Sequence, residues 1–196
     1  MLRGTDIGYD THSAVVGNRD SAGGAVLVGL DYAGSGLFRY RALVGYEVRN
    51  HADPQYANIS SPIIEASVVW TPRLLTTVTG TVRREIDDST DLSSIAYTAN
   101  SVQLNVAQQV RRNVVITGFG EYEQAEFSNG IASGAAGTAV SAIPQPQSIY
   151  SAGVGATWLL NRTTRLNLSY QFIDRRSDPQ LTFTENVALL TLGFGL

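Results

Sequence analysis

Apolar and polar residues alternate with a period of two along most of the chain. In residues 37–49 one face carries Phe38, Tyr40, Ala42, Val44, Tyr46 and Val48, and the other carries Arg39, Arg41, Leu43, Gly45, Glu47 and Arg49. The same alternation occurs in residues 25–32, 64–71, 150–160, 165–172 and 187–196. Because successive side chains of a strand point to opposite faces, the pattern predicts strands with one apolar and one small or polar face. Residues 102–112 resemble an amphipathic helix, but their own alternation favours a strand.

The connections between these segments alternate between short and long. The short ones are residues 33–36, 71–73, 111–113 and 161–163, and the long, polar ones are about 14–21, 50–60, 87–95, 128–148 and 177–184. About ten antiparallel strands of roughly 10–14 residues result, which is longer than the usual 5–6 of globular sheets. Transmembrane β-barrels have short turns at one end and long loops at the other.

The composition agrees with a barrel. Charged residues make up 16% of the chain, against about 25% in a typical soluble domain, yet hydrophobic residues make up 43%. The net charge of −3 argues against a polybasic nucleic-acid binder, and no apolar run of about 20 residues predicts a transmembrane helix. A sheet with one face in lipid and one in water has this profile. A soluble β-sandwich adhesin is the alternative, although it gives no reason to segregate the connection lengths.

Aromatic residues gather at both ends of the predicted apolar face. Tyr32, Phe38, Trp70, Trp158 and Phe194 lie beside short turns, and Tyr46, Tyr122, Tyr150 and Tyr170 lie toward the long connections. Two aromatic belts around an aliphatic band are typical of membrane interfaces, so we predict an aromatic girdle at each end. Filling of an ordinary sandwich core is the alternative.

Charged residues lie mostly on the opposite face, which we predict to line the lumen of the barrel. They are Asp31, Arg39, Arg41, Glu47, Arg49, Glu65, Arg83, Glu85, Arg111, Glu121, Glu123 and Arg165. They could pair across neighbouring strands and fill a small barrel, or line a wet channel in a wider one. In a soluble sandwich the same residues would form the solvated outer face. The near-balance of the two signs predicts weak ion selectivity.

Residues that could carry chemistry are few. The chain has no Cys, and its only histidines, His12 and His51, lie near long connections without a nucleophile motif or paired carboxylates. The Asp87, Asp88 and Asp91 spacing matches no metal-binding loop, and the glycine pairs around Phe119 and Val154 lie inside strands. We therefore predict no catalytic, metal or cofactor site. An outer-rim enzyme that uses His12 or His51 stays open as an alternative.

Three segments resemble a known family. They are residues 66–72 (ASVVWTP), 153–162 (GVGATWLLNR) and 166–170 (LNLSY), in which W-T-P and L-N-R punctuate strands. The chain resembles the outer-membrane β-barrel proteins of the barrel porin 2 type from Gram-negative proteobacteria, over roughly residues 22–196. The resemblance implies an integral outer-membrane barrel, often linked to exopolysaccharide or surface-polymer systems, with no established catalytic residues. Its implied partners are outer-membrane lipid and lipopolysaccharide, the barrel-assembly machinery, and polysaccharide or small solutes, with no nucleic acid.

The two ends of the chain depart from the expected pattern. Residues 1–6 contain no apolar segment typical of a signal peptide, and family members are usually longer. We therefore expect residues 1–196 to form one barrel domain that lacks N-terminal strands and a signal peptide. Many outer-membrane barrels end on an aromatic residue, whereas here Gly195 and Leu196 follow Phe194. The expected function is a porin-like channel or scaffold for solute or polysaccharide passage, without chemistry of its own.

Overall fold

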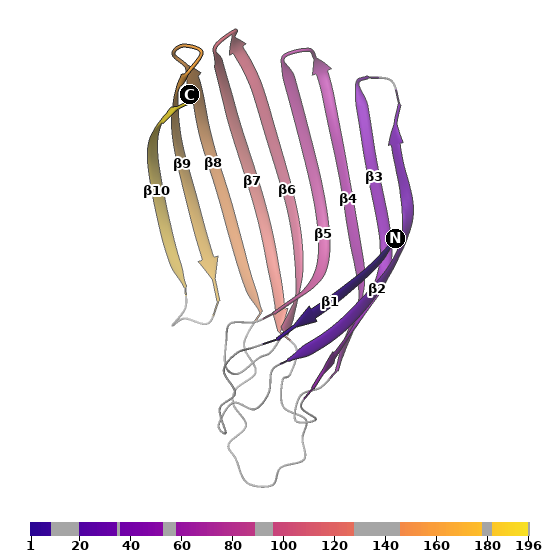
Figure 1. The fold of residues 1–196 in the computed structure, drawn as a ribbon. Coiled ribbons are helices and arrows are strands. Elements are labelled where there is room, and N and C mark those ends of the chain that lie inside the picture. The colour runs from indigo at the N-terminus through magenta and orange to yellow at the C-terminus, as the bar shows by residue number, and fades with distance from the viewer. Residues whose placement is uncertain are drawn as a thin grey trace.

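Ten antiparallel strands in chain order form one curved sheet in a computed structural model of the protein (Figure 1). The structure describes residues 1–8, 20–34, 36–52, 58–88, 96–127, 146–177 and 182–195. The strands are β1 (Leu2–Ile7), β2 (Ser21–Ala33), β3 (Phe38–His51), β4 (Ile59–Arg73), β5 (Thr76–Asp88), β6 (Ala96–Arg111), β7 (Val114–Phe127), β8 (Gln147–Leu159), β9 (Thr164–Arg176) and β10 (Phe183–Phe194). The all-β, up-and-down antiparallel fold predicted from the alternation is confirmed, and residues 102–112 do form a strand.

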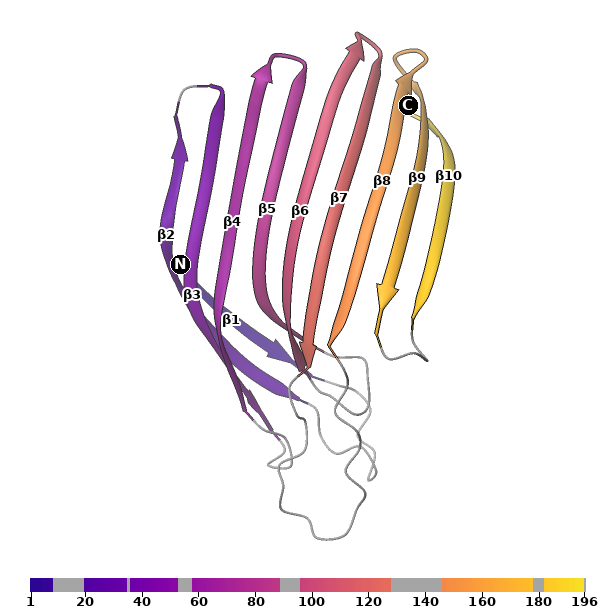
Figure 2. The ribbon, with the colours of Figure 1, turned by 180° about the vertical axis from the view of Figure 1, so that it is seen from behind.

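The sheet is open within the described part of the chain. Each strand pairs with the next one in sequence, and no pairing among the described residues joins β10 to β1. Seen from the front and from behind, β2 to β10 stand side by side while the short β1 turns across the concave side (Figures 1 and 2). The short turns therefore share one end of the sheet, and the connections predicted to be long leave from the other.

One register runs through all nine strand pairs. Val26 faces Tyr46, Val44 faces Ile64, and Val102 faces Tyr122, so that even-numbered residues oppose even-numbered ones throughout the regular ladders. The even-numbered side chains consequently share the convex face, and the odd-numbered ones share the concave face. This arrangement is the one that the period-two pattern of the sequence predicts.

Three of the predicted short turns are displaced. The first begins after Ala33, which belongs to β2. Residues 71–73 were expected to connect two strands, but they belong to β4, and the turn falls at Leu74 and Leu75. A register shift between Trp70 and Arg73 accommodates Pro72, which has no N–H to give to the ladder. A second shift between Gln109 and Arg111 lets β6 include Arg111, so that the turn begins one residue later than expected.

A small apolar cluster lies on the concave side of β2 to β4. Ala25, Leu27 and Ile63 are buried there, and Leu43 packs against them. Leu27 and Leu43 each face a glycine across the β2–β3 ladder, Gly45 and Gly29 respectively. The Leu27 side chain folds over Gly45, and the backbone of Leu43 approaches Gly29, so that the two strands come close together.

Candidate functional site

The convex face is apolar over its whole middle. Aliphatic side chains, which folding normally buries, are exposed here. The exposed fraction is 72% for Val28, 62% for Val154 and 65% for Leu190. An apolar surface of this size on a water-soluble protein marks a contact with another apolar phase or partner. Charged residues at even-numbered positions, such as Arg84, Asp174 and Arg176, lie toward the ends of their strands.

Aromatic rings border this apolar band at the turn end. Tyr32 and Tyr40 lie 5.0 Å apart between ring centroids, and Phe38 stacks on Trp70 at 6.0 Å. Trp158 and Phe194 lie at the same end of β8 and β10, where 47% and 74% of their surface is exposed. All five aromatic residues expected at this end are therefore on the convex face near short turns, and Tyr40 joins them.

Tyrosines border the band at the other end. Tyr122 and Tyr150 lie 4.9 Å apart between ring centroids. The hydroxyl groups of Tyr46 and Tyr170 donate hydrogen bonds to Ser60 at 3.1 Å and to Asn186 at 2.6 Å. Because the rings extend the apolar band while the hydroxyls of Tyr46 and Tyr170 meet polar groups, these tyrosines suit a boundary between an apolar phase and water.

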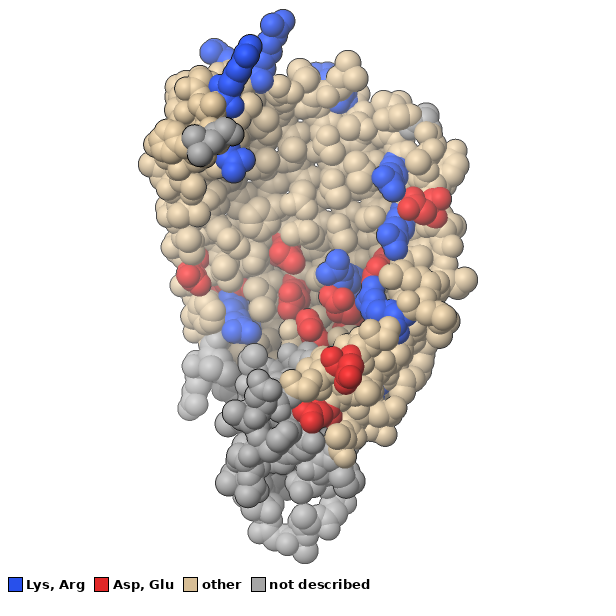
Figure 3. Space-filling model, viewed as in Figure 1, with Lys and Arg blue, Asp and Glu red and all other residues tan. Residues whose placement is uncertain are grey.

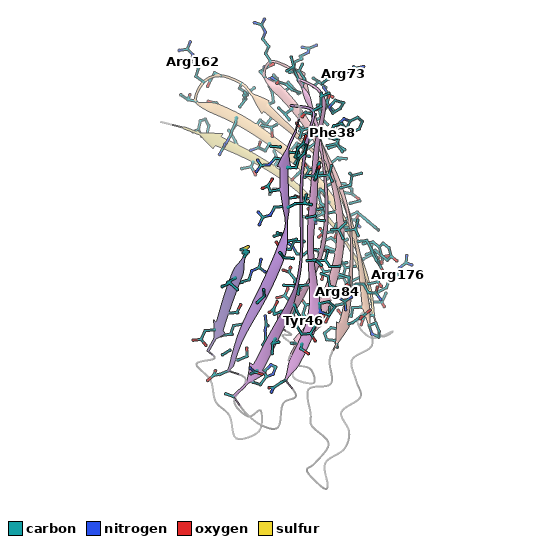
Figure 4. The ribbon with its side chains drawn as sticks, turned by 90° about the vertical axis from the view of Figure 1, so that its right-hand side faces the viewer. Phe38, Tyr46, Arg73, Arg84, Arg162 and Arg176 are labelled. Atoms are coloured by element: carbon teal, nitrogen blue, oxygen red, sulfur yellow. The ribbon has the colours of Figure 1, made fainter. Side chains whose placement is uncertain are left out.

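Two arginines mark the polar border beyond the tyrosines. Arg84 donates to Asn100 Oδ1 at 2.9 Å and to the Pro62 carbonyl at 3.2 Å. Arg176 pairs with Asp174 at 2.9 Å and lies over the Tyr150 ring, 5.2 Å from its centroid. In the edge-on view, Phe38 and Arg73 lie near the turn end, and Tyr46, Arg84 and Arg176 lie toward the other end (Figure 4).

The apolar band approaches the height of the lipid-facing band of a transmembrane barrel. Phe38 and Tyr46 bound it on β3, and Tyr150 and Trp158 bound it on β8, in both cases eight residues apart. At about 3.3 Å per residue this separation is roughly 26 Å along the strand, or about 20 Å for a strand tilted by 40°. The apolar band of transmembrane barrels is about 25 Å tall.

The concave face carries the charged residues singled out from the sequence. Asp31, Arg39, Arg41, Glu47, Arg49, Glu65, Arg83, Glu85, Glu121, Glu123 and Arg165 occupy odd positions of regular ladders. Arg111 ends β6 beyond a register shift, so the alternation does not determine its side. Figure 3 looks onto this face and shows acidic and basic atoms gathered in its half nearer the long connections, with further arginine atoms at the turn end.

Several of these charges form ion pairs. Arg49 pairs with Glu47 at 3.0 Å, and both side chains are buried. Arg83 pairs with Glu85 at 3.4 Å and Arg39 with Asp31 at 3.6 Å. Arg3, which the sequence did not single out, reaches from β1 to Glu65 of β4 at 2.5 Å. The alternation could have identified Arg3, since its number is odd, but the partner lies on a strand that is not its neighbour.

An uncharged hollow lies on the concave face between the charged zone and the turns. Its lining comes from Thr77, Thr79, Asn105, Ala107, Thr117 and Phe119, together with the backbone around Val106 and Gly118. The Phe119 ring lies over Gly153 of β8, at the point where any side chain of residue 153 would collide with it. The hollow therefore combines hydroxyl, amide and aromatic groups, and none of its lining residues is charged.

Of the residues weighed for catalysis or metal binding, the structure describes only some. His12 and Asp91 lie outside the described residues, while His51 ends β3, where its backbone N–H donates to Asn58 at 3.1 Å. No group of three or more His, Cys, Asp or Glu among the described residues could hold a metal ion. The described residues also contain no helix that is long and apolar enough to cross a membrane.

Comparison with known proteins identifies the family. The family described as putative β-barrel porin 2 matches residues 4–194, almost the entire chain. The chain belongs to this family. Its ten-stranded sheet agrees with a porin-like barrel, and the family resemblance inferred from the W-T-P and L-N-R segments is confirmed. The family description is that of a porin-like β-barrel, a class that spans outer membranes. No curated protein and no solved structure matched the chain.

Proposed function

We propose that this β-barrel porin forms a pore through an outer membrane, with its convex face against lipid and its concave face lining the lumen. The observation that carries the proposal is the opposite polarity of the two faces along one continuous register. The convex face is apolar between two rows of aromatic residues, whereas the concave face bears ion pairs and hydroxyl and amide groups. A polar lumen and a lipid-facing band with aromatic borders are the general features of such barrels.

The chemistry of the concave face suits small polar solutes and neutral hydroxylated polymers. The hollow around Phe119 offers threonine hydroxyls, the Asn105 amide and an aromatic ring. Sugars use such groups, because their hydroxyls need hydrogen-bond partners and their C–H faces pack on rings. This hollow favours passage of a solute or surface polysaccharide over a purely structural scaffold.

Conductance of the purified protein in planar lipid bilayers tests the pore. We expect discrete current steps after insertion, and partial block of the current by a neutral oligosaccharide at millimolar concentration. Phe119→Ala should weaken the block while leaving the open current similar, and Phe119→Tyr should preserve it. Folded, inserted protein that gives no current steps at any voltage would refute the pore and leave a scaffold.

A further inference from the structure

Ion pairs cancel many of the charges on the concave face. The pairs Arg3–Glu65, Arg49–Glu47, Arg83–Glu85 and Arg39–Asp31 each place a guanidinium within 4.0 Å of a carboxylate. A close pair looks nearly neutral to an ion farther away than the pair's own separation. The field along this face therefore comes mainly from the charged residues without such a partner.

The unpaired carboxylates lie toward the long connections. Asp87, Glu121, Glu123 and Glu185 have no guanidinium at ion-pair distance within the described residues, and Glu121 accepts only a hydrogen bond of 3.5 Å from Gln103. Arg175 is an unpaired cation in this part of the concave face, where it lies against the Phe183 ring at 5.8 Å. Arg41 of β3, in the same ladder row as Glu121, also has no described carboxylate at ion-pair distance. We call this set of residues the acidic zone; its net charge is negative.

Five further unpaired guanidiniums lie at the turn end. Arg73, Arg111, Arg112, Arg162 and Arg165 lie in or beside the turns, all are exposed, and none has a described carboxylate at ion-pair distance. The Arg165 side chain lies over Gly193 on the concave face. We call these residues the arginine rim.

Uncharged rows separate the two zones. From β5 to β9 the rows through Phe119, Thr117 and Val115 contain no charged residue. Along β7, Glu121 is eight positions away from Asn113 at the turn, a distance of about 26 Å along the strand. This distance exceeds the Debye length of about 10 Å at 0.1 M salt, so each zone acts on ions separately.

From this arrangement we infer that the pore rectifies ionic current, with the acidic zone and the arginine rim acting in series. The inference rests on the proposed function as a pore. When the side of the long connections is at the more positive potential, cations enter through the acidic zone and anions enter through the arginine rim, so ions accumulate between them. The opposite voltage drives each ion against the zone that repels it, and the lumen is depleted of carriers. Weak overall selectivity, as expected from the balance of signs, thus coexists with a strongly asymmetric current.

Current–voltage curves of single pores in symmetric KCl test the inference. At 0.1 M we expect the currents at opposite voltages to differ by at least about twofold, and at 1 M, where the Debye length falls to about 3 Å, we expect a ratio close to one. Orientation in the bilayer changes the sign of the asymmetry and not its size. A conducting wild-type pore with a linear curve at 0.1 M would overturn the rectification and leave the pore function intact, whereas the absence of any conductance would overturn both.

Charge-neutralising variants assign the asymmetry to the two zones. Glu121→Gln with Glu123→Gln, and separately Arg111→Gln with Arg165→Gln, should each bring the current ratio at 0.1 M closer to one. The matched control is Asp174→Asn with Arg176→Gln, which removes one charge of each sign from the convex face. The control should keep the wild-type ratio. An unchanged ratio in both test variants, in pores that still conduct, would contradict the assignment.

Discussion

Gly29 should be among the glycines least tolerant of substitution in the sheet. A β-carbon added there would land on the Ala42 carbonyl oxygen and lie 2.7 Å from Leu43 Cα and 2.8 Å from the Ala42 carbonyl carbon. All three obstacles belong to the backbone of β3, so no side-chain rotation can relieve the collision. Strands β2 and β3 would have to separate at the point where Gly29 faces Leu43.

The size of the effect follows from three contributions. Overpacking costs about 1–3 kcal/mol. Separation of the strands weakens one or two ladder hydrogen bonds, each with a net value of about 1 kcal/mol. Alanine is better than glycine in a strand by about 0.5–1 kcal/mol, which offsets part of this cost. Together these terms predict that Gly29→Ala lowers the free energy of unfolding by about 1–4.5 kcal/mol.

Urea unfolding of the protein in lipid vesicles measures this loss. The midpoint should fall without a change in the slope of the transition, because the surface exposed on unfolding is unchanged. Gly120→Ala is the matched control, since no atom lies within 4 Å of the added β-carbon in β7. The control should be unchanged or stabilised by about 0.5–1 kcal/mol. Equal midpoints for the two variants would refute the argument from close strand approach.

Three further outcomes are expected. Arg49→Gln should destabilise the protein by about 3–5 kcal/mol in urea unfolding, because it leaves the buried Glu47 carboxylate unpaired. The double variant Glu47→Gln with Arg49→Gln should lose less stability, and an equal loss would contradict this reasoning. Arg3→Gln removes a partly exposed ion pair worth at most about 1 kcal/mol. Amide hydrogen exchange in β1 should therefore accelerate up to about fivefold, while the free energy of global unfolding stays unchanged. An exchange rate equal to that of the wild type would show that the pair does not hold β1. Trp70 and Trp158 should be quenched most by lipids brominated near the headgroup, as measured in vesicles with each tryptophan in turn replaced by Phe; stronger quenching from the chain ends would place them outside a girdle.

Strand positions were predictable because alternation is a local property of the sequence. Each strand needs only its own residues to show which side chains share a face, and the structure extends rather than moves most of the predicted segments. The turn after β4 was misplaced for a local reason too. Thr71, Pro72 and Arg73 have turn composition, but Thr71 donates from its backbone N–H to the Leu37 carbonyl at 2.9 Å, and this bond keeps β4 paired beyond Trp70.

Contacts between distant strands were not predictable from alternation. The pairing of Arg3 with Glu65 depends on how β1 crosses the concave side, and the hollow depends on the register in which Phe119 meets Gly153. The residues between β7 and β8 form a long connection, so the sequence does not specify that register. The sequence therefore indicated which residues share the concave face, but not which of their charges cancel.

The single register links the polarity of the convex face to that of the concave face. A slip of one residue in β7 would turn Glu121 and Glu123 toward the apolar convex face and Tyr122 toward the polar concave face. Both changes are unfavourable, so alternation excludes a one-residue slip of such a strand. Strand β10 differs, because Val187 and Leu189 are apolar on the concave face while Leu190 and Leu192 are apolar on the convex face. Polarity therefore discriminates poorly between its registers. The hydrogen bond from Tyr170 to Asn186 and the packing of Arg165 over Gly193 must then align β10 on β9, which makes them structural determinants that hydrophobic patterning does not reveal.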